Sequence, residues 1–210
     1  MITQSFLYNA IYFTYALVLI NFYHVPATEV PIYGLAFSIG NLAGPLALGP
    51  LFDSWGRKQM IAGTYIVSAV LLALSAVFFD AKVLNATTQT IMWVVIFFFA
   101  SAGASAAYLT VSETWPIEIR AEAIAVFFAI GCIAGALGPA FYGALIGNGS
   151  SRTGLFIGYL VGAGIMLIGG LVEVFLGVQA AGKSLEQVTK PLTSTDQETP
   201  ATQAASTAAA

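Results

Sequence analysis

Long stretches without a single charged residue most restrict what this chain can fold into. Six of them cover residues 1–28, 30–52, 59–79, 83–112, 123–151 and 153–172. Each reaches the roughly 20 apolar residues with which a helix crosses the ~30 Å hydrocarbon core of a bilayer. Of all residues, 8% are charged and 58% are hydrophobic, whereas soluble domains are about 25% charged. The sequence therefore predicts an integral membrane protein with six spans.

These runs favour helices over strands. They are continuously apolar and do not alternate with period two, as the strands of a membrane barrel do. A helix also satisfies its backbone hydrogen bonds within one segment, which lipid requires. We predict an all-α, polytopic fold with spans near 5–24, 31–52, 60–79, 89–112, 122–146 and 154–178.

Together the spans form a predicted transmembrane domain over residues 1–182. The cytoplasmic tail over 183–210 is rich in Ser, Thr and Ala and has no apolar face, so we expect it to be largely disordered. The first residues lack the basic region and cleavage site of a signal peptide.

Lys and Arg in the short connections predict the topology. In an alternating six-helix chain, one side receives Arg57, Lys58, Arg120, Lys183 and Lys190, and the other receives Lys82 and Arg152. Positively charged connections stay in the cytoplasm. We therefore expect both termini in the cytoplasm and the chain in the cytoplasmic (plasma) membrane of a bacterium, surrounded by the lipid bilayer. No basic patch predicts nucleic-acid binding.

A short repeat divides the chain into two units. "IGNLAG" at 39–44 and "IGCIAG" at 130–135 are each followed by a Gly-Pro pair, and the shift between them maps the first three spans onto the last three. Units with an odd number of spans have opposite orientations, as in many carriers. We predict two inverted three-helix repeats. The alternative is that small residues four apart merely pack helices closely.

Two short connections concentrate charge, "DSWGRK" at 53–58 and "SETWPIEIRAEA" at 112–123. Glycine permits a tight turn in the first. If both lie on one face, we expect Arg57 to pair with Glu113 and Asp53 with Arg120, as a gate that forms in one conformation and breaks in another. The alternative is that these charges only fix topology. The candidate gate residues are Asp53, Gly56, Arg57, Lys58, Glu113 and Arg120.

Four motifs resemble those of one family. "DSWGRK" resembles the D-x-x-G-R-[RK] motif of the major facilitator superfamily, and "SETWPIEIRA" is similar to the sugar-porter pattern S-E-x-F-P-x-x-x-R-[AG]. "GKSLEQV" at 182–188 is similar to the sugar-porter ending G-[RK]-S-L-E-E-[IV]. Gln4 with "NAIYF" at 9–13 resembles the end of Q-Q-x-x-G-x-N-A-x-x-Y-Y. Their order is that of the C-terminal six-helix half of a sugar porter.

This resemblance implies secondary active transport of a small polar solute, a sugar or an organic metabolite, by alternating access. It implies that the chain acts as the C-terminal half of a twelve-helix carrier. The expected partners are then the solute, protons in a symport mechanism, and the missing N-terminal half or a second copy. The alternative is a truncated fragment that does not transport.

Polar residues in otherwise apolar spans are the candidates for solute binding. Tyr8, Tyr12 and Tyr15 recur at helical spacing, which favours a cavity lining, although Tyr8 also suits an interfacial aromatic belt. Ser105 and Tyr108 share a face that is either cavity or packing surface. The family resemblance points to Gln4 and Asn9. The complete set is Gln4, Asn9, Tyr12, Tyr15, Asn41, Ser105 and Tyr108.

Glu173 lies well within a span, which makes it a candidate for proton coupling. The alternative is that it reaches the nearby interface. An intramembrane serine protease also has six spans, but a serine nucleophile such as Ser105 needs a base close by, and the one histidine, His24, belongs near the opposite surface. A channel would need paired half-helices or a charged ring.

We therefore expect no enzyme, no catalytic residue, no cofactor and no metal site. The single cysteine, Cys132, excludes a disulfide within the chain, and we expect it to be a small packing residue.

Overall fold

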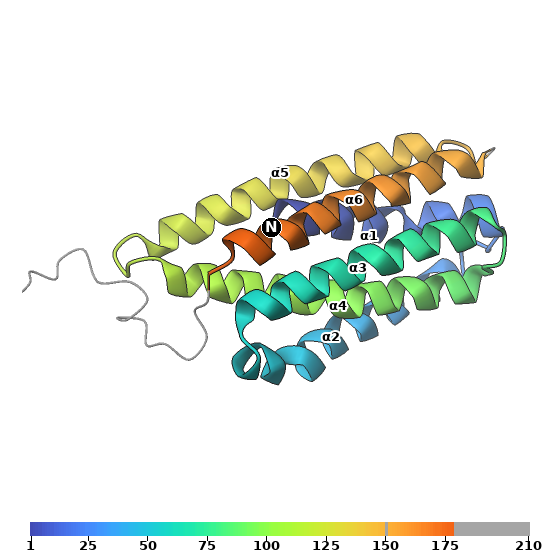
Figure 1. Cartoon of the computed structure of the whole chain (residues 1–210). Coiled ribbons are helices and arrows are strands. Elements are labelled where there is room, and N and C mark those ends of the chain that lie inside the picture. The colour runs from blue at the N-terminus through green and yellow to red at the C-terminus, as the bar shows by residue number, and fades with distance from the viewer. Residues whose placement is uncertain (150, 179–210) are drawn as a thin grey trace, which may run out of the picture.

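The computed structural model of the chain describes residues 1–149 and 151–178 (Figure 1). The predicted tail over 183–210 lies outside these residues. The described part consists of six α-helices: α1 (Ile2–Tyr23), α2 (Val30–Ser54), α3 (Arg57–Asp80), α4 (Ala86–Thr114), α5 (Arg120–Ile146) and α6 (Arg152–Leu176). All six are long and apolar enough to cross a membrane, with mean hydropathies between 1.3 and 2.2. Their ends lie within a few residues of the predicted spans.

Charged and turn-forming residues set the helix ends. Only Trp55 and Gly56 separate α2 from α3, and Gly56 has a φ of 98°, which side-chain-bearing residues rarely adopt. α4 begins with a capping box in which Asn85 and Thr88 each bond the backbone of the other at 2.8 Å. The chain therefore reverses direction in a few residues at each connection, and the helices form an antiparallel bundle.

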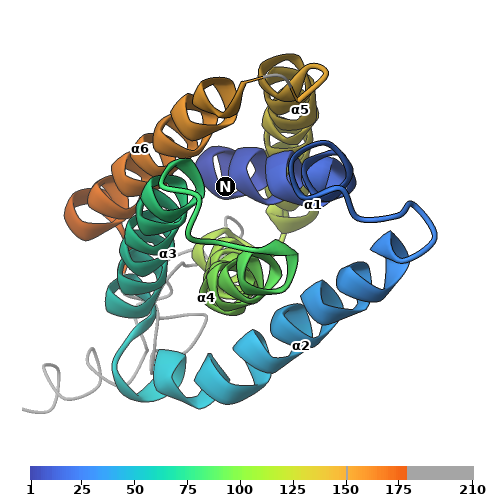
Figure 2. The same cartoon turned by 90° about the vertical axis from the view of Figure 1, so that its right-hand side faces the viewer.

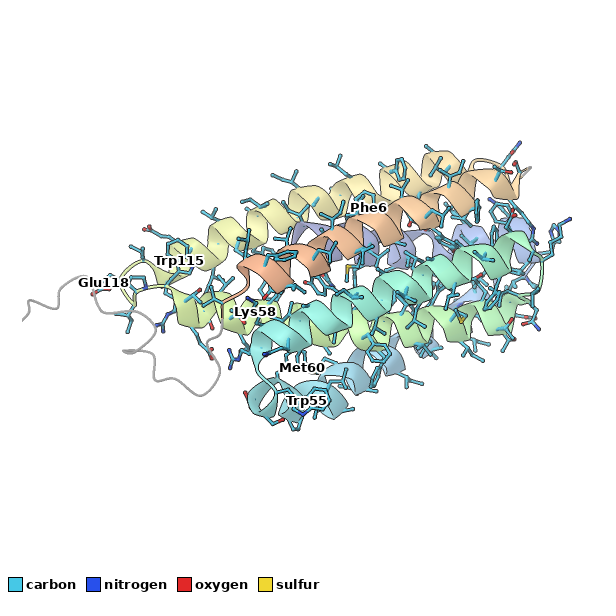
Figure 3. The ribbon with its side chains drawn as sticks, in the orientation of Figure 1. Phe6, Trp55, Lys58, Met60, Trp115 and Glu118 are labelled. Carbon is cyan, nitrogen blue, oxygen red and sulfur yellow. The ribbon has the colours of Figure 1, made fainter. Side chains whose placement is uncertain are left out.

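The bundle has two ends, which we name after an arginine at each. The Arg57 end holds the α2–α3 and α4–α5 connections and the end of α6. The Arg152 end holds the α1–α2, α3–α4 and α5–α6 connections. Trp55, Lys58, Trp115 and Glu118 all lie toward the Arg57 end, while Phe6 lies farther along the bundle (Figure 3). The two charged connections therefore share one face, as predicted.

Helix contacts follow the predicted repeat. The most extensive contacts join α3 to α6, α1 to α5 and α2 to α4. An end-on view shows α4 near the centre, with α2 along one side and α3 along the other (Figure 2). Exchanging α1–α3 with α4–α6 maps α1–α5 onto α4–α2 and α3–α6 onto itself. The fold is thus two three-helix units that make the same pairings, the first being α1–α3 and the second α4–α6.

Repeated glycines allow the close pairings. A Cβ at Gly44 of α2 would overlap the carbonyl oxygen of Phe98 in α4, and one at Gly135 of α5 would come within 2.6 Å of the Asn9 amide in α1. These two glycines occupy the same place in the repeat. The alternative reading, close helix packing, is therefore also true, because the repeat makes the same glycine contact in both units.

Candidate functional site

A polar cavity of about 370 Å³ lies between α1, α2, α4 and α5. Asn41 and Cys132, which line it, are near the middle of α2 and α5. α1 and α4 are the first helices of the two three-helix units, so the cavity lies where the units meet. None of the described side chains that line it is charged. Such a position, at mid-helix between inverted repeats, is where carriers hold solutes.

Five of the seven predicted solute-binding residues line this polar cavity: Gln4, Asn9, Asn41, Ser105 and Tyr108. They come from three helices and are far apart in the sequence. Because their amides and hydroxyls face one space, that space can both donate and accept hydrogen bonds.

Asn41 is the most constrained residue of the polar cavity. Its Nδ2 donates to the hydroxyl of Tyr8, and Ser101 Oγ donates to its backbone oxygen at 2.9 Å. Its Oδ1 is buried and accepts no hydrogen bond from the described residues. A buried acceptor without a donor costs free energy. Asn41 is therefore held by α1 and α4 with one acceptor left for a ligand.

Gln4 and Asn9 approach the cavity from α1. Asn9 Nδ2 donates to the backbone oxygen of Ser5 at 2.8 Å, which fixes the amide along its own helix. Gln4 is 5% exposed and forms no side-chain hydrogen bond with the described residues. The polar cavity thus contains one amide already oriented by the backbone and one whose hydrogen-bonding groups are free for a ligand.

The three regularly spaced tyrosines of α1, Tyr8, Tyr12 and Tyr15, lie in different surroundings. Tyr8 lines the polar cavity, while Tyr12 and Tyr15 are not among its lining residues. Tyr12 stacks on Tyr8 with ring centroids 6.0 Å apart, and Tyr15 packs against Phe37 at 5.1 Å. The sequence contains a signal for Tyr8, because it lies one turn from Gln4 on the same helix face.

Cys132 does not have the packing role expected of it. The side chain is exposed and lines the polar cavity. The small residues around it in α5 predicted close packing, but the thiol lines the cavity. Ser5 and Ser101 are further cavity residues that the sequence analysis did not select.

At the Arg57 end, Arg57 and Glu113 form the expected ion pair. Their side chains are 12% and 26% exposed, so water screens them only in part. Asp53 Oδ1 lies 3.9 Å from Arg57 Nη2 but is 78% exposed. The turn at Gly56 places Arg57 at the first position of α3, beside the last turn of α4.

The expected pair between Asp53 and Arg120 is wrong. Asp53 lies four residues before Arg57, across the α2–α3 turn, and its one ion pair within the described chain is with that residue. Arg120 instead donates to the carbonyl oxygen of Trp115, from Nε at 3.4 Å and Nη2 at 3.3 Å. The short connection before α5 folds Arg120 back onto the end of α4, which uses its donors locally.

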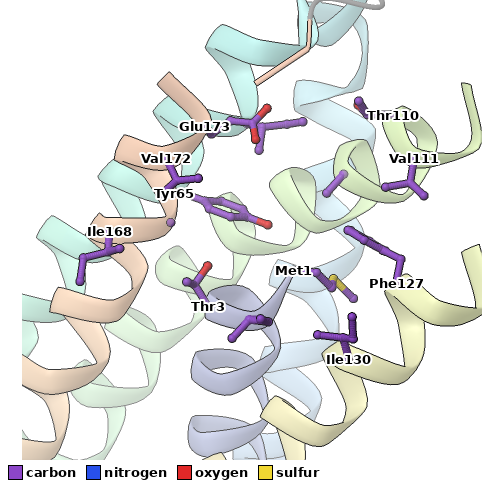
Figure 4. Close-up of a pocket in the computed structure, with 14 residues that line it drawn as sticks. Met1, Thr3, Tyr65, Thr110, Val111, Phe127, Ile130, Ile168, Val172 and Glu173 are labelled. Carbon is purple, nitrogen blue, oxygen red and sulfur yellow. The ribbon is translucent and has the colours of Figure 1, made fainter. Parts of the chain in front are cut away.

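Glu173 lies in a second cavity, of about 440 Å³, toward the Arg57 end (Figure 4). The cavity is mostly apolar and includes residues from α1, α3, α4, α5 and α6. Tyr65 points into it from α3, and its buried hydroxyl has no hydrogen-bond partner among the described residues. Glu173 is thus half-buried beside a cavity, one turn from the end of α6.

At the other end, Arg152 bonds two helices at once. Its Nη1 donates to the carbonyl oxygen of Phe79 at 2.9 Å and its Nη2 to that of Phe22 at 3.4 Å. The guanidinium carbon is 4.8 Å from the centroid of the Phe79 ring and 5.7 Å from that of Tyr23. From the sequence, Arg152 was expected only to fix topology by its charge, because the acceptors of these two bonds are backbone carbonyl oxygens.

Six apolar helices in two equivalent units, with an uncharged polar cavity between them, define a helical membrane protein of the carrier class. The sequence model of the Major Facilitator Superfamily matches residues 1–206. The chain therefore belongs to this family, whose members transport small solutes across membranes. Neither a curated protein nor a solved structure matches the chain.

Proposed function

We propose that this chain is one six-helix half of a secondary active carrier that moves a small polar solute by alternating access. The observation that supports this most is the polar cavity, in which Gln4, Asn9 and Asn41 meet from two helices near mid-bundle. Its buried, unpaired Asn41 Oδ1 favours a ligand that donates a hydrogen bond.

The solute is a neutral polar molecule, such as a sugar or an organic metabolite rich in hydroxyl groups. Amides, hydroxyls and aromatic rings line the cavity, and no described side chain there offers an opposite charge. A charged solute would lose its hydration without compensation. The similarity of two motifs to sugar porters favours a sugar, and the rings of Tyr8 and Tyr108 suit the apolar face of one.

The second wall of the cavity comes from another six-helix unit, either an N-terminal half or a second copy of this chain. α2 and α5, which border the cavity, are the least buried helices of the bundle. Alternating access requires two units that move against each other around a fixed site. The competing hypothesis is a fragment that binds but does not transport.

The Arg57–Glu113 ion pair is part of the gate at the cytoplasmic side. It fixes the α2–α3 turn against the end of α4, within one six-helix unit. Asp53, Gly56, Lys58 and Arg120 support the same end. Glu173, beside its own cavity, is the candidate that takes up a proton during symport. In this proposal both termini lie in the cytoplasm and the chain resides in a bacterial inner membrane.

Cys132 allows a direct test of binding, because the one cysteine of the chain lines the proposed site. The full chain in nanodiscs is treated with a maleimide in the presence of hexoses, pentoses or polyols, with gluconate and glucosamine as charged comparators. A bound neutral solute should slow alkylation severalfold, and the Asn41→Leu variant should lose this protection.

Ser112→Ala is the matched control, since Ser112 lies on α4 but is not among the residues that line the polar cavity. Its protection should equal that of the wild type. Equal protection by neutral and charged solutes, or none by any neutral solute, would refute the proposed substrate class.

A further inference from the structure

Arg57 and Arg152 occupy the same position in the two three-helix units. Arg57 is the first residue of α3, and Arg152 is the first residue of α6. These are the third helices of their units. Because the units are inverted, the two arginines lie at opposite ends of the bundle.

The contacts of the two arginines also correspond. Arg57 binds Glu113, in the last turn of α4, which is the first helix of the other unit. Arg152 binds the carbonyl oxygen of Phe22, in the last turn of α1, again the first helix of the other unit. Each arginine therefore joins the start of a third helix to the end of a first helix across the boundary between units.

The acceptors at the Arg152 end are suited to a guanidinium group. The last carbonyl groups of a helix lack donors within that helix and carry the negative end of its dipole. Phe22 and Phe79 lie in the last turns of α1 and α3, and one planar guanidinium reaches both of their oxygens. Three aromatic rings within 6.0 Å add cation–π attraction.

We infer that Arg152 is a positioning residue that fixes the far end of α1, as the counterpart of the Arg57–Glu113 pair at the opposite end. α1 carries Gln4, Tyr8 and Asn9 of the polar cavity. Arg152 therefore determines where that helix lies against α3 and α6. The structural part of this inference does not depend on any solute being bound.

Lys82 provides a matched control at the same end. It lines a third cavity, of about 450 Å³, at the Arg152 end, together with Arg152, His24 and Asp80. Within the described chain its ammonium group forms no ion pair and no hydrogen bond, whereas Arg152 bonds two carbonyl groups. Replacing it removes one positive charge from this end without removing a contact between helices.

The test is hydrogen exchange, followed by mass spectrometry, on the full chain in nanodiscs. Arg152→Gln should speed exchange about tenfold in the last turns of both α1 and α3, the factor expected for losing a hydrogen bond to a charged group. Exchange at the end of α4 should not change. Arg152→Lys keeps the charge but not the planar guanidinium group. It should therefore give an intermediate increase in exchange rate in the last turns of α1 and α3.

The inference is overturned if only amides next to position 152 exchange faster, or if Lys82→Gln has the same effect as Arg152→Gln. Should the Gln variant fail to insert, the Lys variant decides, because unchanged exchange at the ends of α1 and α3 also overturns the inference. A second readout concerns positioning: Arg152→Gln should alter the alkylation rate of Cys132 in the polar cavity, and Arg152→Lys should partly restore it.

Discussion

At both ends of the bundle an arginine joins the two three-helix units, but the groups that accept its hydrogen bonds differ. At each end, an arginine that begins a third helix meets the last turn of a first helix from the other unit. At the Arg57 end the acceptor is a carboxylate, Glu113. At the Arg152 end the acceptors are two backbone carbonyl groups.

The two kinds of acceptor differ in how readily the contact can form and break. A carboxylate can be protonated, repelled by another charge or recruited by a different cation, so the Arg57–Glu113 pair is suited to a contact that forms and breaks. Carbonyl oxygens in the last turn of a helix stay in place as long as the helix does. The Arg152 contact is therefore the more permanent one, and motion of the units should begin at the Arg57 end.

The largest effect is expected from charge reversal at the switchable end. Arg57→Glu places a third carboxylate beside Glu113 and Asp53, and transport by the assembled carrier should fall at least about tenfold. The double variant with Glu113→Arg should recover much of the loss, because it restores an opposite-charge pair. Uptake into proteoliposomes measures both. A double variant no better than the single one would show that this pair has no role in transport.

The next largest effects are expected from the repeat-related glycines Gly44 and Gly135. They test whether the two units pack equally closely in the middle of the bundle. Gly44→Leu forces a side chain against a backbone carbonyl and should lower the free energy of unfolding by about 1–3 kcal/mol. Gly135→Leu should cost less, because its nearest neighbour is the movable amide of Asn9. Gly63→Leu is the control, as nothing lies within 4 Å of a Cβ there.

Thermal unfolding in detergent gives the order of these three variants. If Gly63→Leu is as damaging as Gly44→Leu, the close approach of α2 to α4 does not explain the cost.

A loss of similar size should follow at the Arg152 end. Arg152→Gln leaves two carbonyl groups without their charged donor, and we expect the free energy of unfolding to fall by about 1.5–3 kcal/mol. Lys82→Gln should change it by less than about 0.5 kcal/mol. Equal losses in the same unfolding assay would mean that positive charge in general, and not the bonds of Arg152, stabilises this end.

The smallest effect is expected at Asp53. Its side chain is 78% exposed and 3.9 Å from Arg57, so Asp53→Asn should change the free energy of unfolding by less than about 0.5 kcal/mol. Glu113→Gln, which removes the less exposed partner, should cost clearly more. The reverse order would mean that Asp53, and not Glu113, is the main partner of Arg57.

The fold could be predicted almost completely from the sequence, because uncharged runs of helical length have few other solutions in lipid. The two units were visible in the glycine repeat. Asn41 could be selected because a polar side chain in an apolar span needs a hydrogen-bond partner, and Gln4 and Asn9 because of the family resemblance. Their meeting in one cavity depends on helix pairing, which the repeat only implies.

The remaining features depend on geometry that a pattern of residue types does not contain. Arg120 does not pair with Asp53 as predicted, because the short connection before α5 directs its N–H groups to the carbonyl oxygen of Trp115. Arg152 binds carbonyl oxygens, and every residue has one. Cys132 looked like a packing residue because small apolar neighbours surround it in the sequence, although its side chain faces the cavity.

None of the described side chains that line the polar cavity is charged, and this has an electrical consequence. Moving one elementary charge through the membrane potential is worth about 2.3 kcal/mol per 100 mV. A neutral molecule that settles among Gln4, Asn9 and Asn41 carries no charge through that field, so voltage does no work on this step. Any voltage sensitivity of the cycle must then arise elsewhere, with Glu173 or the ionised groups at the two ends.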